Sequence, residues 1–260
     1  MHIAITGASS GIGEGLARQY GGADNKLTLV ARRGDRLRDL AESLAAETLV
    51  CSADLSVLDT ACDWIDEAVS KHGPIDLLIN NAGMQYVEAA QGVSDERAET
   101  LLRLNLLGPI RLTRRVLPSM LERGRGAVVN ISSVAGVIFP PAMAHYCASK
   151  AGLAAYSEVL SAELLGTGVH VLTVYPGPVS TPMERAAVDQ LEDSWGARNA
   201  PTGSVEGIAR AIESCVDRRQ ARLFYPRSYR LTRYFGALAQ WVANRFTPGL
   251  RAVKPAKNDG

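Results

Sequence analysis

The sequence has few cysteines, and the four that it has are scattered along the chain. None of them forms a CxxC pair or lies near a group of histidines; they are Cys51, Cys62, Cys147 and Cys215. Zinc modules and disulfide frameworks both depend on clustered cysteines, so the sequence argues against either and predicts no metal site. We expect a reduced, cytoplasmic setting.

An excess of charge is also missing, as is any long hydrophobic run. Lysine and arginine total 28 and aspartate and glutamate 27, which gives no reason to expect a nucleic-acid partner. No stretch is long enough to span a bilayer. A strand-like segment already begins at residue 2, so we expect no signal peptide. A length of 260 residues suits one α/β domain.

Apolar segments alternate with helical patterns through most of the chain, which predicts a doubly wound parallel sheet of about seven strands. The expected strands are His2–Thr6, Leu27–Ala31, Thr48–Ala53, Ile75–Asn80, the start of AVVNISSVAG from Ala127, Val169–Tyr175 and Ala221–Tyr225. The expected helices include Ile12–Tyr20, Val57–His72, one that runs from a cap at Ser94 toward Leu121, and Ser204–Asp217.

A glycine-rich turn follows the first expected strand. Gly7, Gly11 and Gly13 lack the GxGxxG spacing but have the same physical use. Without side chains, they let the backbone approach a pyrophosphate at a helix N-terminus, where free N–H groups favour anions. The alternative is a structural loop with incidental glycines.

The segment HYCASKAG places Tyr146 and Lys150 four residues apart, so in a helix both lie on one face. A phenol normally titrates near about 10, and a cation one turn away would lower its pKa toward the working range. Such a pair suits acid and base chemistry. By itself the spacing could also arise by chance.

Ser133 stands thirteen residues before Tyr146, at the end of an expected strand. Ligands of open parallel sheets bind outside the carboxyl ends of the strands, where Ser133 would lie beside the helix of Tyr146. Neighbouring residues of a strand point to opposite faces, which favours Ser133 over Ser132. A further polar cluster, NNAG from Asn80 to Gly83, follows the apolar part of another expected strand.

Together these motifs resemble those of the short-chain dehydrogenase/reductase family, in its compact single-domain branch. The motifs are TGASSGIG from Thr6, NNAG from Asn80, LNLLG with Asn105, ISS with Ser133, YCASK from Tyr146 and PGPVST from Pro176. They stand in the family's order and cover roughly the first 180 residues and, less sharply, about the next 45. The resemblance implies a Rossmann-type fold and a homodimer or homotetramer.

The resemblance also assigns the site residues. It implies catalysis by Asn105, Ser133, Tyr146 and Lys150, with Asn105 on a water-mediated proton path from Lys150; alternatively, Asn105 only satisfies backbone groups. For the cofactor it implies Gly7, Ser9, Ser10, Gly11, Ile12, Gly13, Arg32, Arg33, Asp54, Leu55, Asn81, Ala82, Gly83, Tyr146, Lys150, Pro176, Gly177, Val179 and Thr181. Asp54 could equally be a helix cap.

The end of the second expected strand bears on the choice of cofactor. An acidic residue there would bind a ribose 2′-hydroxyl, whereas this chain has Arg32 and Arg33, which can hold a 2′-phosphate. We therefore expect NADP(H) in preference to NAD(H). The alternative is that the arginines merely begin a solvated helix.

Apolar residues between Ser133 and Tyr146 indicate a lipophilic substrate. The segment VIFPPAMA, residues 137–144, would form a pocket wall, which Met84, Tyr86, Met183 and Trp195 could complete. Apolar residues beside a site are, however, more often core packing. Residues 184–201 are expected to form a lid.

After residue 226 the chain departs from the compact plan, so we divide it into a cofactor-binding and catalytic domain, 1–226, and a helical extension of it, 227–260. Its apolar residues recur at helical spacing and are Leu231, Tyr234, Phe235, Leu238, Trp241, Val242 and Phe246. Arginines flank them. The extension packs on its own domain or a second subunit, or else residues 227–251 touch a membrane surface.

The sequence thus predicts an NADP(H)-dependent oxidoreductase that transfers hydride between the nicotinamide and a carbonyl or secondary alcohol. The rival hypothesis is a nucleotide-sensing or scaffold protein that keeps the fold and has lost the chemistry. The presence of Asn105, Ser133, Tyr146 and Lys150 together argues against it. Epimerase or dehydratase chemistry on nucleotide sugars would need a longer substrate region after Pro176.

Overall fold

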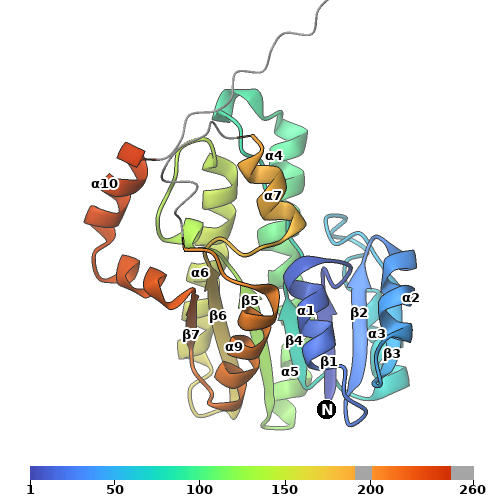
Figure 1. Ribbon diagram of the computed structural model, residues 1–260. Coiled ribbons are helices and arrows are strands. Elements are labelled where there is room, and N and C mark those ends of the chain that lie inside the picture. Colours follow the sequence, from blue (N-terminus) through green and yellow to red (C-terminus); the bar gives the residue numbers. More distant parts are fainter. Residues whose placement is uncertain (191–200, 247–260) are drawn as a thin grey trace, which may run out of the picture.

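A seven-stranded parallel sheet forms the centre of the protein in a computed structural model, which describes residues 1–190 and 201–246 apart from the side chains of residues 239, 242 and 246 (Figure 1). The strand order is β3-β2-β1-β4-β5-β6-β7. The strands are β1 (His2–Thr6), β2 (Lys26–Ala31), β3 (Glu47–Ser52), β4 (Leu77–Asn80), β5 (Gly126–Ile131), β6 (Val169–Pro176) and β7 (Arg222–Tyr225). The predicted doubly wound α/β fold is confirmed.

Helices cover both faces of the sheet, as right-handed crossovers between parallel strands require. On one face lie α1 (Gly11–Gln19), α2 (Gly34–Glu42) and α9 (Val205–Asp217). On the other lie α3 (Trp64–His72), α5 (Gly108–Glu122) and α6 (Ala144–Glu163). The remaining elements are η1 (Ala90–Gly92), α4 (Asp95–Leu102), η2 (Arg103–Leu107), η3 (Val134–Gly136), α7 (Pro182–Val188), η4 (Arg227–Arg233) and α10 (Gly236–Phe246).

Alternation along the strands builds two cores, one on each face. Ile3 and Ile5 pack against α1 and α2, whereas Ala4 between them belongs to the core under α3 and α5. Because both faces are covered, the strands are apolar at nearly every position rather than at every second one. The continuous apolar runs of the sequence follow from this double burial.

Two helices differ from the sequence prediction. The predicted helix Val57–His72 begins only at Trp64, because residues 57–63 form turns with hydrogen bonds such as Thr60 N–H to Val57 C=O, 3.2 Å, and Asp63 N–H to Thr60 C=O, 3.2 Å. The long helix capped by Ser94 is interrupted by a π-helical segment, η2, that contains Asn105. The predicted irregularity at Asn105 is therefore present.

The carboxyl ends of the strands define the functional edge of the sheet. The chain crosses from β3 back past β1 to β4, so β1 has β2 on one side and β4 on the other. This reversal opens a crevice at the strand ends, where ligands of doubly wound sheets bind. In Figure 1, α4 and α7 lie at this end of the sheet.

The extension after β7 is a 3₁₀ helix, η4, followed by α10, rather than one helix beginning near Leu231. It packs on its own chain, because the side chain of Gln240 bonds both backbone groups of Phe139, at 2.8 Å and 2.9 Å. Its predicted apolar face does not make this contact: Leu231, Tyr234, Phe235, Leu238 and Trp241 are 59% to 68% exposed.

The part of the chain that the structure describes contains no helix with both the length and the apolar character needed to cross a bilayer. Val242 and Phe246 of the predicted apolar face, Trp195 of the predicted pocket and most of the predicted lid lie outside the described residues or side chains.

Candidate active site

A cavity of about 480 Å³ lies at the carboxyl ends of the strands. It brings together almost every residue that the sequence assigned to cofactor or catalysis: Gly7, Ser9, Ser10, Gly11, Ile12, Arg32, Arg33, Asp54, Leu55, Asn81, Ala82, Gly83, Ser133, Tyr146, Lys150, Pro176, Gly177, Val179 and Thr181. Gly13 and Asn105 do not line it. Each of them instead contacts a residue that lines the cavity, Gly7 for Gly13 and Met84 for Asn105.

The glycine-rich turn forms a cradle that side chains would fill. Gly7 and Gly11 have φ of +67° and +59°, and a Cβ on Gly13 would lie 2.4 Å from the Gly7 carbonyl oxygen. Asn81 holds this turn by donating to the Thr6 carbonyl, 2.9 Å. The Ser10 side chain does not cap α1, so the first N–H groups of α1 remain available for an anion. These residues fit the pyrophosphate of a dinucleotide.

Two arginines stand at the adenosine end of the cavity. Arg33 bonds the hydroxyls of Ser9 and Ser10, each at 2.9 Å, and thereby joins β2 to the glycine-rich turn. Arg32 lies 3.9 Å from Asp54 in an exposed ion pair, and such a pair contributes little to the stability of the fold. Arg33 is also the residue that precedes α2, which agrees with the alternative that the arginines begin a helix. Their predicted hold on a 2′-phosphate stays a prediction.

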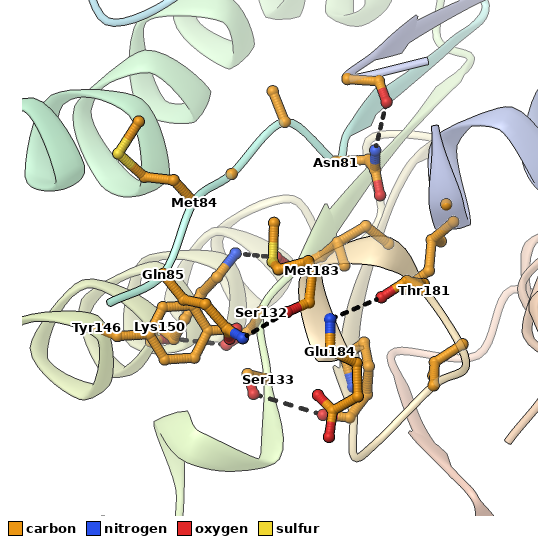
Figure 2. A pocket seen from close by; sticks show the side chains of 18 of the residues that line it. Asn81, Met84, Gln85, Ser132, Ser133, Tyr146, Lys150, Thr181, Met183 and Glu184 are labelled. Carbon is orange, nitrogen blue, oxygen red and sulfur yellow. Dashed lines mark hydrogen bonds between the residues drawn. The ribbon is translucent and has the colours of Figure 1, made fainter. Parts of the chain in front are cut away.

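Tyr146 and Ser133 both line the cavity, and Ser133 Oγ donates to the Pro176 carbonyl at 3.4 Å (Figure 2). Burial raises the pKa of Tyr146 to about 12, although a hydrogen bond with the Ser133 hydroxyl lowers it. Ser132 instead donates to the Lys150 carbonyl, 2.8 Å, which fastens β5 to α6. The contacts therefore support the choice of Ser133 over Ser132.

Lys150 does not lower the pKa of Tyr146 as its place one turn away had suggested. Its Nζ lies 5.9 Å from the centroid of the Tyr146 ring and donates to the Ile131 carbonyl, 2.8 Å. Burial dominates both groups: it raises the pKa of the phenol and lowers that of Lys150 to about 8. An ammonium has three donors, so Lys150 retains two for a ligand such as a ribose.

Asn105 is fully buried and supports the loop that follows β4. Its Oδ1 accepts from Met84 N–H, 2.9 Å, and its Nδ2 donates to the Met84 carbonyl, 2.8 Å, and to Ser149 Oγ, 3.1 Å. The two bonds to Met84 satisfy backbone groups, which is the alternative role that the sequence left open for Asn105. Together with the bond to Ser149, they connect η2, the loop after β4 and α6, and so hold one wall of the site.

Part of the expected apolar wall lines the same cavity as Ser133, Tyr146 and Lys150. Ile138, Pro140 and Met143 of the segment before α6 line the cavity, together with Met84 and Met183. Tyr86 does not line it, because its ring packs under the Arg97 guanidinium at 4.3 Å.

Three polar lining residues escaped the sequence prediction: Gln85, Glu184 and Tyr229. Gln85 donates to the Met183 carbonyl, 3.3 Å. The Tyr229 ring packs so closely on Gly177 that a Cβ added to this glycine would lie 2.6 Å from the ring. Tyr229 reaches the cavity only through the packing of η4, which no local pattern predicts. Glu184 could have been found from the sequence. Thr181 followed by Pro182 is a helix-start signal, and a helix that starts there has Glu184 in its first turn.

A doubly wound sheet with an anion cradle and a buried serine, tyrosine and lysine defines a nicotinamide-dependent oxidoreductase. A family model described as short chain dehydrogenase matches residues 1–192. The chain belongs to this family, as the motifs predicted, and is an oxidoreductase that acts on alcohol or carbonyl groups.

Similar proteins span most of the chain. Dehydrogenase/reductase SDR family member 7B of Danio rerio is 36% identical over 78% of this chain and 68% of its own length. The 11-beta-hydroxysteroid dehydrogenase 1A of Arabidopsis thaliana is 33% identical over 88% of this chain and 69% of its own. A short-chain dehydrogenase from Sphingobium yanoikuyae, solved in complex with NADPH, is 29% identical with a TM-score of 0.79, covering 98% of both chains.

Proposed function

We propose that the protein reduces a lipophilic ketone or aldehyde with NADPH, and catalyses the reverse oxidation. The observation that carries the proposal is that Ser133, Tyr146 and Lys150 line the same cavity as the glycine-rich turn and the two arginines. A pure nucleotide sensor, the rival hypothesis, would have no use for a buried phenol at the far end of its nucleotide site.

NADPH, when bound, supplies the hydride that reaches the carbonyl carbon. The chain supplies the rest. Ser133 donates a hydrogen bond to the substrate oxygen, and Tyr146 transfers its phenolic proton to that oxygen. The two remaining donors of Lys150 hold the ribose, and Asn105 positions the loop at Met84 and supports a water path toward Lys150. Burial raises the pKa of Tyr146 to about 12, so at neutral pH the phenol carries the proton that the reductive step consumes.

Preference for NADP(H) over NAD(H) is supported by the arginine pair Arg32 and Arg33, which directly follows β2 in place of an acidic residue. It agrees with the NADPH that the Sphingobium relative binds. A lipophilic substrate is supported by the wall of Ile138, Pro140 and Met143. It also agrees with the name of the plant hydroxysteroid dehydrogenase. A cytoplasmic location, a homodimer or homotetramer and membrane-surface contact of the extension stay predictions.

Tyr146→Phe tests the proposal. Loss of the proton donor should lower kcat for a ketone panel by about 10²–10⁴-fold, because that is the usual contribution of positioned proton transfer. The affinity for NADPH, measured by fluorescence titration, should change little. Tyr156→Phe on the same helix is the matched control, since Tyr156 does not line the cavity. Unchanged turnover in Tyr146→Phe would refute the role of the phenol.

A further inference from the structure

Glu184 places a carboxylate in the cavity, next to the apolar residues Pro182 and Met183 of its own wall (Figure 2). No ion pair or side-chain hydrogen bond from the residues that the structure describes reaches this carboxylate, although its backbone N–H donates to Thr181 Oγ1 at 3.2 Å. The side chains of the preceding wall residues, Pro182 and Met183, carry no N–H or O–H group. Glu184 is half-buried, so a ligand that fills the cavity takes water away from its carboxylate and must supply a hydrogen bond in exchange.

The backbone of Glu184 is held firmly at the start of α7. Thr181 caps the helix, Pro182 has the φ that the first helical position needs, and Gln85 ties the Met183 carbonyl to the loop after β4. The carboxylate is therefore presented to the cavity by a fixed element rather than by a free loop. Burial raises the pKa of Glu184, as expected for a carboxylate withdrawn from solvent.

Glu184 lines the same cavity as two phenols, those of Tyr146 and Tyr229. Its charge contributes, after burial, to the raised pKa values of Tyr146 on α6 and Tyr229 on η4. The carboxylate and the Tyr146 phenol therefore face one shared cavity. A substrate that fills this cavity and reaches Tyr146 with its carbonyl would also meet the wall that Glu184 forms.

On the basis of the proposed function, we propose that Glu184 is a specificity-determining residue that accepts a hydrogen bond from a hydroxyl or amino group near the substrate carbonyl. The substrate class is then a lipophilic carbonyl compound with an adjacent hydrogen-bond donor, rather than a plain hydrocarbon ketone. A site built around a polar partner rejects analogues that lack it, because its own group is left unpaired.

Three matched ketones test this assignment: propiophenone, phenacyl alcohol and phenacylamine, which differ only in a terminal methyl, hydroxyl or ammonium group. Each would be assayed for turnover with NADPH, and for binding to protein saturated with NADP⁺ by tryptophan fluorescence. Glu184→Leu and Glu184→Gln are compared with the natural protein. Glu206→Gln is the matched control, because Glu206 stands in the first turn of α9 after the cap Ser204 but away from the cavity.

In Glu184→Leu, the preference for phenacyl alcohol over propiophenone should fall by about tenfold or more, since a hydrogen bond to a charged group has that effect on affinity. Glu184→Gln should keep the preference for the alcohol and lose that for the ammonium. Unaltered preferences in Glu184→Leu, with NADPH affinity intact, would overturn the assignment. Absence of turnover with every carbonyl would refute the proposed function instead, and the binding preferences would still decide the role of Glu184.

Discussion

At the scale of single residues, burial has a larger effect on the pKa of Tyr146 than the lysine one helical turn away. Tyr146 and Lys150 stand one turn apart, and that spacing predicts a phenol with a lowered pKa. In the structure, burial raises the pKa of the phenol, and the Lys150 ammonium turns to the Ile131 carbonyl. Charge–charge attraction across a turn is modest, whereas withdrawal from water penalises the ionised form directly.

Arg33 is the residue that should decide between the two coenzymes. Arg33→Ala removes a guanidinium that can pair with a 2′-phosphate, so we expect Kd for NADPH to rise about tenfold and Kd for NADH to change little. Fluorescence titration with both coenzymes measures this. Arg36→Ala, an exposed arginine on α2 that does not line the cavity, is the control.

A different outcome would assign Arg33 another role. Its bonds to Ser9 and Ser10 support the glycine-rich turn, which serves either coenzyme. An equal loss of affinity for NADPH and NADH in Arg33→Ala would therefore show a structural arginine and contradict the predicted preference.

At the scale of elements, Glu158 of α6 ties the extension to the helix that carries Tyr146 and Lys150. Its carboxylate accepts two bonds from Arg222 of β7, both at 2.8 Å, two from Arg233 of η4, at 2.9 Å and 3.4 Å, and one from the Tyr175 hydroxyl at 2.5 Å. The bonds from Arg222, opposed by burial, are the largest cause that lowers the pKa of Glu158 to about 2. A depressed carboxyl pKa stabilises the fold above the unfolded value of 4.5.

Glu158→Gln should therefore loosen η4 and lower the free energy of unfolding by about 1–3 kcal/mol, because the arginines lose a charged acceptor. Hydrogen exchange should become faster across 227–246. The difference from the natural protein should shrink as pH falls from 4.5 toward about 2, where the natural carboxyl is protonated. Glu163→Gln, on the same helix and exposed, should have no such effect. Exchange that is unchanged in Glu158→Gln would contradict the anchoring role.

At the scale of the whole molecule, three buried histidines lie toward the amino ends of the strands, away from the site. His2 bonds Gly73 and Thr28 and packs edge-on against His72, with ring centroids 5.2 Å apart, and His170 bonds the Gln220 carbonyl at 3.0 Å. Burial is the first cause that lowers the pKa of all three below 6.5.

The unfolded chain therefore binds protons at these histidines before the folded one does, and stability should be lost as pH falls below about 6.5. Tm measured from pH 8 to pH 5 should decline over the lower part of this range. His2→Gln should reduce the decline, since it removes one of the titrating groups. A Tm that stays constant across the range would show that these rings do not control acid stability.

The sequence by itself determined the sheet, the family and nearly all of the cavity lining. Strands buried on both faces must be apolar throughout, and the glycines and polar residues at their ends mark where the backbone meets a ligand. Such signals are local, so residues such as Gly7, Ser133 and Tyr146 could be found without coordinates. Even the irregularity at Asn105 followed from one polar residue within an apolar run.

Only the tertiary structure decided what depends on segments distant in the chain. It showed that Asn105 holds Met84, that Tyr229 of the extension reaches the cavity, and that Gln240 bonds α10 to Phe139. It also placed the carboxylate of Glu184 in the cavity that Tyr146 lines, and this carboxylate forms no ion pair or side-chain hydrogen bond with the residues that the structure describes. Burial and pairing are set by whatever packs around a side chain, and that packing exists only when the whole fold has formed.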